Sequence, residues 1–116
     1  MALDHVNVYV IDEGDSWTII DTGFWSKKTQ SIWSDIKEKW FSDKPIGKVI
    51  VTHHHPDHVG LAGWFQTEFK AELWMSRTAW LMARMLRLDY QKLPTEETIN
   101  FWRRAGMDDL ILNERA

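Results

Sequence analysis

Four histidines and one aspartate crowd into a single short polar segment of this sequence. The segment reads Thr52-His53-His54-His55-Pro56-Asp57-His58-Val59-Gly60 and separates an apolar run from an amphipathic one. In an extended loop the imidazoles of His53 and His55 point the same way, so they can converge on one cation. Asp57 and His58 follow where the chain turns, and they can hold a second cation nearby. Neutral imidazole and carboxylate are the ligands of hydrolytic zinc, and two such cations can share a bridging hydroxide.

The alternative to a metal site is a run of solvated or hydrogen-bonded loop histidines. Four fixed positions filled with these residue types rarely arise by chance, so the spacing favours the metal site. His54 alternates away from His53 and His55. We therefore expect it to pack against its surroundings or to support the ligands, and not to bind metal itself.

Alternating strands and helices must position this segment, which indicates an α/β fold. The apolar patterns predict strands at 6–11, 17–20, 48–52 and 71–75, and helices at 26–41, 59–69, 77–88 and 95–106. The first two strands are separated by a turn cluster and should pair as an antiparallel hairpin. Residues 53–58 are expected to be a loop at the end of a buried strand, where α/β sheets place their ligand sites.

The spacing of apolar residues also predicts which helix faces turn inward. Helix 26–41 should bury a stripe that runs through Ile32, Ile36 and Trp40, with Trp33 beside it. Helix 77–88 should bury four residues, which are Leu81, Met82, Met85 and Leu86. A last short strand is expected at residues 110–112.

Composition excludes several classes of protein. A chain of 116 residues and 13.7 kDa has room for one domain. Its formal charge of -3 counts against a protein built to grip nucleic acid, and the absence of cysteine excludes disulfides and thiol chemistry. No apolar run has the length of a membrane span, and Asp4 and His5 stand where a secretory signal has a basic start. We therefore expect a cytoplasmic location and no membrane partner.

The spacing His53-x-His55-x-Asp57-His58 after a β-rich strand, with Ile20-Asp21-Thr22-Gly23 upstream, resembles the metallo-β-lactamase-fold hydrolases. The resemblance implies that His53 and His55 bind a first metal and that Asp57 and His58 bind a second. It implies two zinc ions in a complete site, with manganese or iron as substitutes.

The same resemblance assigns roles to two acidic residues. Asp21 lies beneath the metals in that family and would orient a ligand imidazole. Asp57 would also be catalytic, as the proton acceptor or donor beside the bridging hydroxide. Trp25 follows the Asp21 motif, where it would line the mouth above the metals or pack against the core.

The further ligands of the family's site all come downstream of this motif, and no histidine follows His58. The resemblance therefore implies that residues 1–116 form a single partial domain, the N-terminal half of an αββα sandwich with a mixed sheet and flanking helices. In the first strand Val6, Val8 and Val10 should point to one side, and Tyr9 and Ile11 to the other. We expect the open sheet face to be covered by the missing C-terminal half or by a second copy.

The function that these observations imply is the N-terminal portion of a binuclear zinc hydrolase. A metal-bound hydroxide would cut an ester, thioester, lactone or related acyl bond of a small molecule, and residues 1–116 alone should be inactive. A nuclease of the same superfamily is an alternative, because Arg77, Arg84 and Arg87 share one helical face, although the net negative charge counts against it. A second alternative is a non-catalytic association module with vestigial metal binding.

Overall fold

The computed structural model of this chain describes residues 5–88, 95–108 and 110–111. The chain divides into two compact units, Met1–Met85 and Leu86–Ala116. The first unit contains the sheet and the candidate site, and the second contains α5 (Glu96–Arg104). Within the described ranges, no helix combines the length and the apolarity that crossing a membrane requires.

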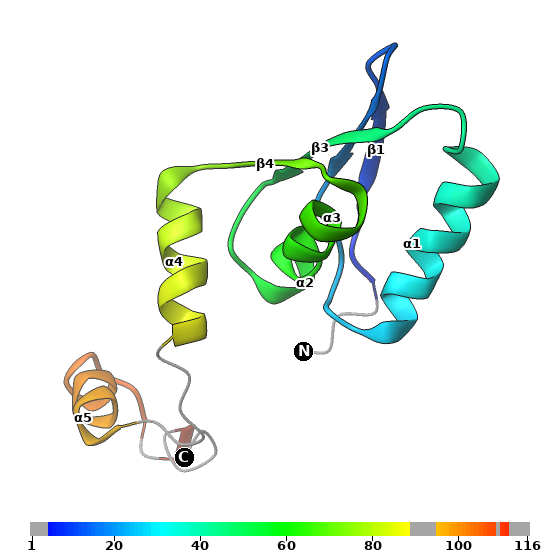
Figure 1. Cartoon of the computed structure of the whole chain (residues 1–116). Coiled ribbons are helices and arrows are strands. Elements are labelled where there is room, and N and C mark those ends of the chain that lie inside the picture. Colours follow the sequence, from blue (N-terminus) through cyan, green and yellow to red (C-terminus); the bar gives the residue numbers. More distant parts are fainter. Residues whose placement is uncertain (1–4, 89–94, 109, 112–116) are drawn as a thin grey trace. The chain divides into compact units, whose positions relative to one another are not determined.

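Four strands of the first unit form one mixed sheet, in the order β1-β2-β3-β4 (Figure 1). Their bounds are β1 (Tyr9–Asp12), β2 (Trp17–Ile20), β3 (Ile46–Val51) and β4 (Glu72–Met75). The predicted hairpin is confirmed, because β1 and β2 pair antiparallel. Strand β3 runs parallel to both β2 and β4, and parallel strands need helical crossovers. The crossovers contain α1 (Lys27–Trp40), α2 (Pro56–Val59) and α3 (Ala62–Phe69).

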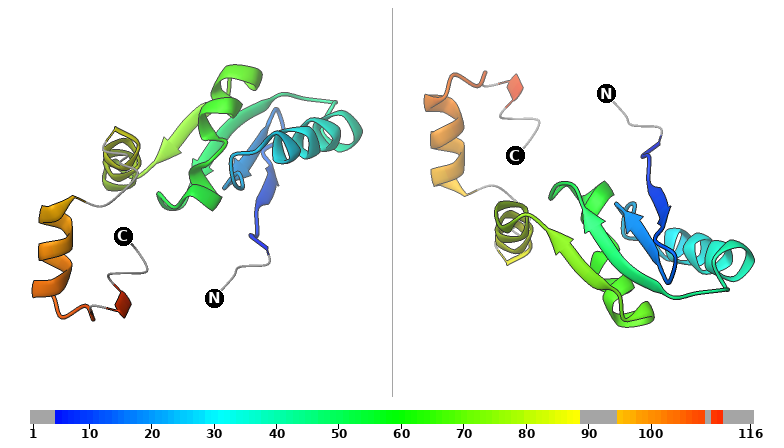
Figure 2. Two further views of the ribbon diagram at one scale, coloured as in Figure 1. Left: turned by 90° about the horizontal axis from the view of Figure 1, so that it is seen from below. Right: turned by 90° about the horizontal axis from the view of Figure 1, so that it is seen from above.

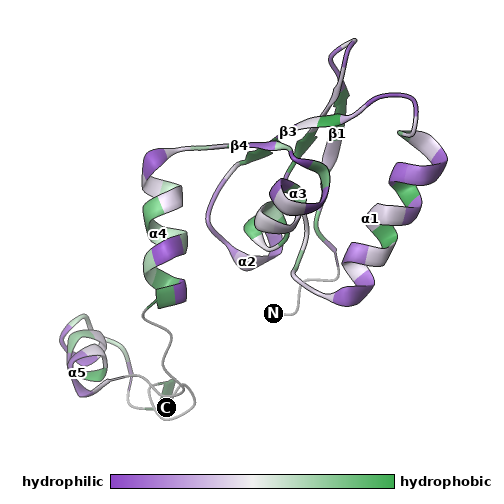
Figure 3. Ribbon diagram, viewed as in Figure 1, coloured by the Kyte–Doolittle hydropathy of each residue, from purple (hydrophilic) through white to green (hydrophobic). Residues whose placement is uncertain are grey.

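The hydrophobic core lies on one face of this sheet. Ile19 and Val49 are register partners and are fully buried. Helices α1 and α3 pack over them from the same side (Figure 2), and the rings of Trp33 and Phe65 meet edge to face at 5.1 Å. Figure 3 shows the apolar strands and the mixed hydropathy of α1. This core holds the ends of β2 and β3 side by side.

The inward face of α1 differs from the expected stripe. Ile32 and Trp40 are 47% and 73% exposed, whereas Trp33 is only 4% exposed. The indole N–H of Trp33 donates a 2.8 Å hydrogen bond to the carbonyl oxygen of Thr22. This bond, together with the contact with Phe65, turns the helix so that Trp33 faces the sheet. The apolar period was right for a helix and wrong for its orientation.

Helix α4 (Arg77–Leu88) begins where the sequence predicted. Ser76 caps it, because its Oγ accepts a hydrogen bond from the Ala79 N–H. The predicted inward residues are wrong in part, since Leu81, Met85 and Leu86 are each about half exposed. Ala79 is the buried residue of α4.

The predicted helix that begins at Thr95 is confirmed in the second unit. The hydroxyl of Thr95 caps it by accepting a hydrogen bond from the Thr98 N–H. Acidic residues fill the first turn of α5 and basic residues the last, as the helix dipole favours. The strand expected at 110–112 is wrong for Leu110 and Ile111, which are helical. Residue 112 lies outside the described residues.

Candidate metal centre

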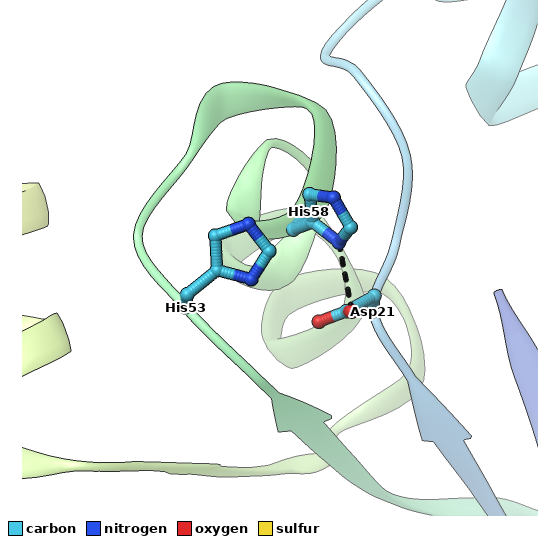
Figure 4. Close-up of side chains that lie close together, drawn as sticks. All are labelled: Asp21, His53 and His58. Carbon is cyan, nitrogen blue, oxygen red and sulfur yellow. Dashed lines mark hydrogen bonds and ion pairs between the residues drawn. The ribbon is translucent and has the colours of Figure 1, made fainter. Parts of the chain in front are cut away.

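Three side chains from separate segments meet where β2 and β3 end. Asp21 follows β2, His53 follows β3, and His58 belongs to α2 (Figure 4). Each offers a potential ligand atom, and these atoms all lie within 4.8 Å of one another. The rings of His53 and His58 lie side by side, with centroids 4.0 Å apart. The geometry thus brings two imidazoles and one carboxylate to a single point.

The Asp21 carboxylate is the anchor of this cluster. Its Oδ1 accepts a 2.8 Å hydrogen bond from the Thr52 N–H. Its Oδ2 accepts a 2.7 Å hydrogen bond from the Thr52 hydroxyl and lies 2.8 Å from Nδ1 of His58. A carboxylate can only accept, so Nδ1 of His58 carries a proton, and in the neutral ring Nε2 keeps its lone pair. The expectation that Asp21 orients an imidazole therefore has a specific geometric basis, which is its contact with His58.

The backbone and the charge state of Asp21 both reflect this role. Its φ of 61° lies in the left-handed region, which aspartate tolerates better than most residues. Burial raises the pKa of Asp21, but hydrogen bonds from the Thr52 N–H, His58 and the Thr52 hydroxyl outweigh burial and leave the pKa below its ordinary value. The side chain therefore stays ionised at neutral pH, as a metal-orienting or metal-binding carboxylate must.

A second set of contacts fastens the segment after Asp21 to the histidine segment. The buried hydroxyl of Thr22 donates to the carbonyl oxygen of His58 and accepts from the Leu61 N–H, both at 2.9 Å. Gly60 lies so close to this segment that a Cβ there would meet the Trp25 nitrogen at 2.6 Å. The two chain segments that carry the cluster are therefore held together independently of it.

The other predicted ligands flank the cluster. The ring of His55 lies 4.7 Å from the ring of His53, and Asp57 Oδ2 lies 3.8 Å from His58 Nε2. The structure groups His53 with His58 more closely than with His55, although the sequence pairing assigned His53 and His58 to different metals. Asp57 and His58 lie in the short helix α2, which begins at Pro56, and not in the expected loop. Proline suits the first turn of a helix because its missing N–H needs no partner there.

The remaining predicted positions have different surroundings. His54 is half-buried and its ring lies 5.1 Å from the ring of His55, so it adjoins the cluster without joining it. Trp25 is 64% exposed, so its indole does not pack in the core of the described chain.

Sequence reasoning placed Thr52 and Gly60 in the candidate segment but assigned no role to either residue. The hydroxyl of Thr52 lies 2.8 Å from Nδ1 of His53 in addition to its bond with Asp21. A hydroxyl residue at the end of an apolar strand, next to a candidate ligand, was the available signal for Thr52. No sequence signal distinguishes Gly60 from the other glycines, because its importance comes from a contact with residues more than thirty positions away.

The donor set fits zinc. His58 presents Nε2 because Nδ1 is held by Asp21, and zinc prefers imidazole nitrogen and carboxylate oxygen ligands of this kind. An outer carboxylate that holds the second nitrogen of a ligand imidazole is a common feature of zinc sites. His55 and Asp57 are near enough to add ligands at the same end of the sheet.

Comparisons with known proteins identify a family and a fold for this chain. The profile of the metallo-beta-lactamase superfamily matches residues 1–114. A search of curated proteins found no match. A similar solved structure is a beta-lactamase domain protein from Burkholderia ambifaria, which is 30% identical with a TM-score of 0.68; the match covers 76% of this chain and 29% of that chain.

Two further solved structures share the fold at lower identity. A metallo-beta-lactamase from Pontibacter korlensis is 18% identical with a TM-score of 0.58, over 75% of this chain and 39% of that chain. The metallo-beta-lactamase FIM-1 from Pseudomonas aeruginosa, solved in a mono-zinc form, is 21% identical with a TM-score of 0.55, over 66% of this chain and 32% of that chain. The matched region is thus well under half of each of these structures. The fold, the clustered donors and the match over residues 1–114 together show that this chain belongs to the metallo-beta-lactamase superfamily.

Proposed function

We propose that this chain is the N-terminal, metal-binding portion of a binuclear zinc-dependent hydrolase that cuts an ester, thioester, lactone or related acyl bond of a small molecule. The observation that carries the proposal is the convergence of Asp21, His53 and His58 at the end of the sheet. Membership of the superfamily supports a hydrolase parent. The substrate class, the identity of the metal and the cytoplasmic location remain our proposals.

Several residues of this chain would have distinct roles at such a metal centre. His53, His55, Asp57 and His58 would hold the metals, and Asp21 would fix the His58 ring. When bound, zinc would supply Lewis-acid chemistry and lower the pKa of water toward neutrality. Asp57 would accept and return a proton near the scissile bond, since its carboxylate lies at the same end of the sheet as the imidazoles.

We also propose that further polypeptide covers the open sheet face. Tyr9, Ile20, Ile50 and Trp74 are register partners across all four strands, on the face opposite the core. Tyr9 and Trp74 are 59% and 54% exposed. A continuous apolar strip of this kind marks an interface. The matched structures contain more than twice the length of chain that aligns here, so we favour a C-terminal half over a second copy as the cover.

Sedimentation of the 116-residue chain tests the covering proposal. The exposed strip predicts self-association or binding of a hydrophobic dye, and Trp74→Ser should reduce both. A monodisperse 13.7 kDa species that binds no dye would contradict an interface on this face.

Hydrolysis assays test the proposed activity. Residues 1–116 offer too few ligands to hold two metals firmly, because catalytic zinc ordinarily has three protein ligands. We expect negligible turnover of esters, thioesters and lactones by this chain, and zinc- or manganese-dependent turnover by a gene product extended with a C-terminal half. A chelator should abolish that activity. An extended product without hydrolytic activity on any of these classes would contradict the proposal, and equal turnover by the short chain would contradict the need for further ligands.

A further inference from the structure

The hydroxyl of Thr52 bridges two groups of the candidate metal centre. Its Oγ1 lies 2.7 Å from Oδ2 of Asp21 and 2.8 Å from Nδ1 of His53. Thr52 itself is exposed, whereas the Asp21 carboxylate that its hydroxyl contacts is buried. Two short contacts from one hydroxyl suggest a role in the site.

The direction of each hydrogen bond follows from proton counting. A threonine hydroxyl has one proton to donate, and an ionised carboxylate has none. If the hydroxyl donated to His53, its oxygen and the carboxylate oxygen of Asp21 would face each other at 2.7 Å without a proton between them. The hydroxyl must therefore donate to Asp21, and its oxygen must accept a hydrogen bond from the Nδ1–H of His53.

We infer that Thr52 is a positioning residue that fixes His53 as its Nδ1–H tautomer and so leaves Nε2 free for a metal. The inference rests on the proposed metal centre for its purpose, but the tautomer is a property of the metal-free chain. Oδ2 of Asp21 then sets both imidazoles, His58 directly and His53 through the Thr52 hydroxyl. One carboxylate oxygen thereby orients two ligand imidazoles in the metal-free chain.

The tautomer can be read directly in the metal-free chain. Long-range proton–nitrogen NMR spectra of the ¹⁵N-labelled protein, recorded at about pH 8, distinguish Nδ1–H from Nε2–H. We expect His53 to be protonated at Nδ1 in the wild type and in Thr52→Ser, which keeps the hydroxyl. Thr52→Val removes the hydroxyl at nearly constant volume and should shift His53 toward the Nε2–H form. Thr67→Val, at an exposed position of α3, is the matched control and should change nothing.

Zinc titration of the same variants supplies a second readout. Loss of a partner that orients a ligand imidazole ordinarily costs about 10- to 100-fold in metal affinity, so Thr52→Val should bind zinc that much more weakly, and Thr52→Ser and Thr67→Val should match the wild type. The inference is overturned if His53 keeps its Nδ1 proton in Thr52→Val, or if its tautomer changes while zinc affinity does not. A wild type that takes up no zinc would refute the proposed metal centre instead, and the NMR spectra would still decide the role of Thr52.

Discussion

At Gly60 the backbone of the histidine segment lies close to the segment after Asp21. Its φ and ψ of −51° and −40° are right-handed, so any residue can adopt its conformation. A Cβ at this position, however, would lie 2.5 Å from the Pro56 oxygen, 2.6 Å from the Trp25 nitrogen and 2.7 Å from the Gly23 oxygen. All three are backbone atoms, which cannot turn away as a flexible side chain does. Gly60→Ala must therefore separate the two segments.

The cost of that separation can be estimated from the contacts that it strains. Overpacking of this kind costs about 1–3 kcal/mol. The hydrogen bonds from the Thr22 hydroxyl to His58 and from the Leu61 N–H to Thr22, both 2.9 Å, span the same interface, and weakening them adds about 1 kcal/mol. We expect Gly60→Ala to lower the free energy of unfolding by about 2–4 kcal/mol in total.

Gly63→Ala is the matched control, because the same methyl group is added at a position with nothing within 4 Å. Gly63 lies in α3, where alanine should raise the free energy of unfolding by about 0.4–1 kcal/mol through the lower entropy of the unfolded chain. Urea unfolding followed by circular dichroism measures both changes. A Gly60→Ala variant as stable as the wild type would refute the close packing of the two segments.

Three further substitutions test individual contacts by the same unfolding assay, with a chelator present. The hydroxyl oxygen of Thr18 is buried without a partner in the described chain, so Thr18→Val should raise the free energy of unfolding by about 0.5–1.5 kcal/mol, and a clear loss would show that the hydroxyl has a partner. Asp21→Asn places an amide against the His58 and Thr52 donors and should cost about 2–3 kcal/mol; an unchanged midpoint would contradict the anchoring role. Trp33→Phe leaves the Thr22 carbonyl without its indole donor and should lower the free energy of unfolding by about 1–3 kcal/mol. The same substitution at the exposed Trp40 is the matched control and should not carry this cost.

Much of the fold could be predicted from local pattern. The antiparallel hairpin, the parallel strand before the histidines and helix α4 follow from β-branched runs, turn clusters and periodicity. These features depend on neighbours in the sequence, which is why the sequence reveals them.

Helix orientation could not be predicted, because it depends on contacts between distant residues. Ile32 and Trp40 have the right spacing for a buried stripe, yet the hydrogen bond from Trp33 to Thr22 decides which face turns inward. For α4, the spacing of Leu81 and Met85 is equally suitable, but these residues are exposed in the described structure.

In the candidate site, too, local sequence patterns indicated some features, and contacts between distant residues determine the others. The spacing of His53 and His58 indicated metal ligands, and the motif around Asp21 indicated an orienting carboxylate. The grouping of His53 with His58 depends on where α2 begins, and that depends on Pro56 and on the packing of Gly60. The bridging hydroxyl of Thr52 depends on the register of β2 and β3, which brings Asp21 beside the end of β3.

Zinc uptake by the wild-type chain and two double variants tests the metal centre most directly. Isothermal titration should show zinc binding by the wild type, and its loss in His53→Ala/His55→Ala, with the helical circular dichroism largely unchanged. The matched control His5→Ala/His54→Ala removes the same number of imidazoles outside the predicted ligand set and should bind zinc as the wild type does. Stoichiometric zinc binding by His53→Ala/His55→Ala would contradict the assignment of the metal centre to this end of the sheet.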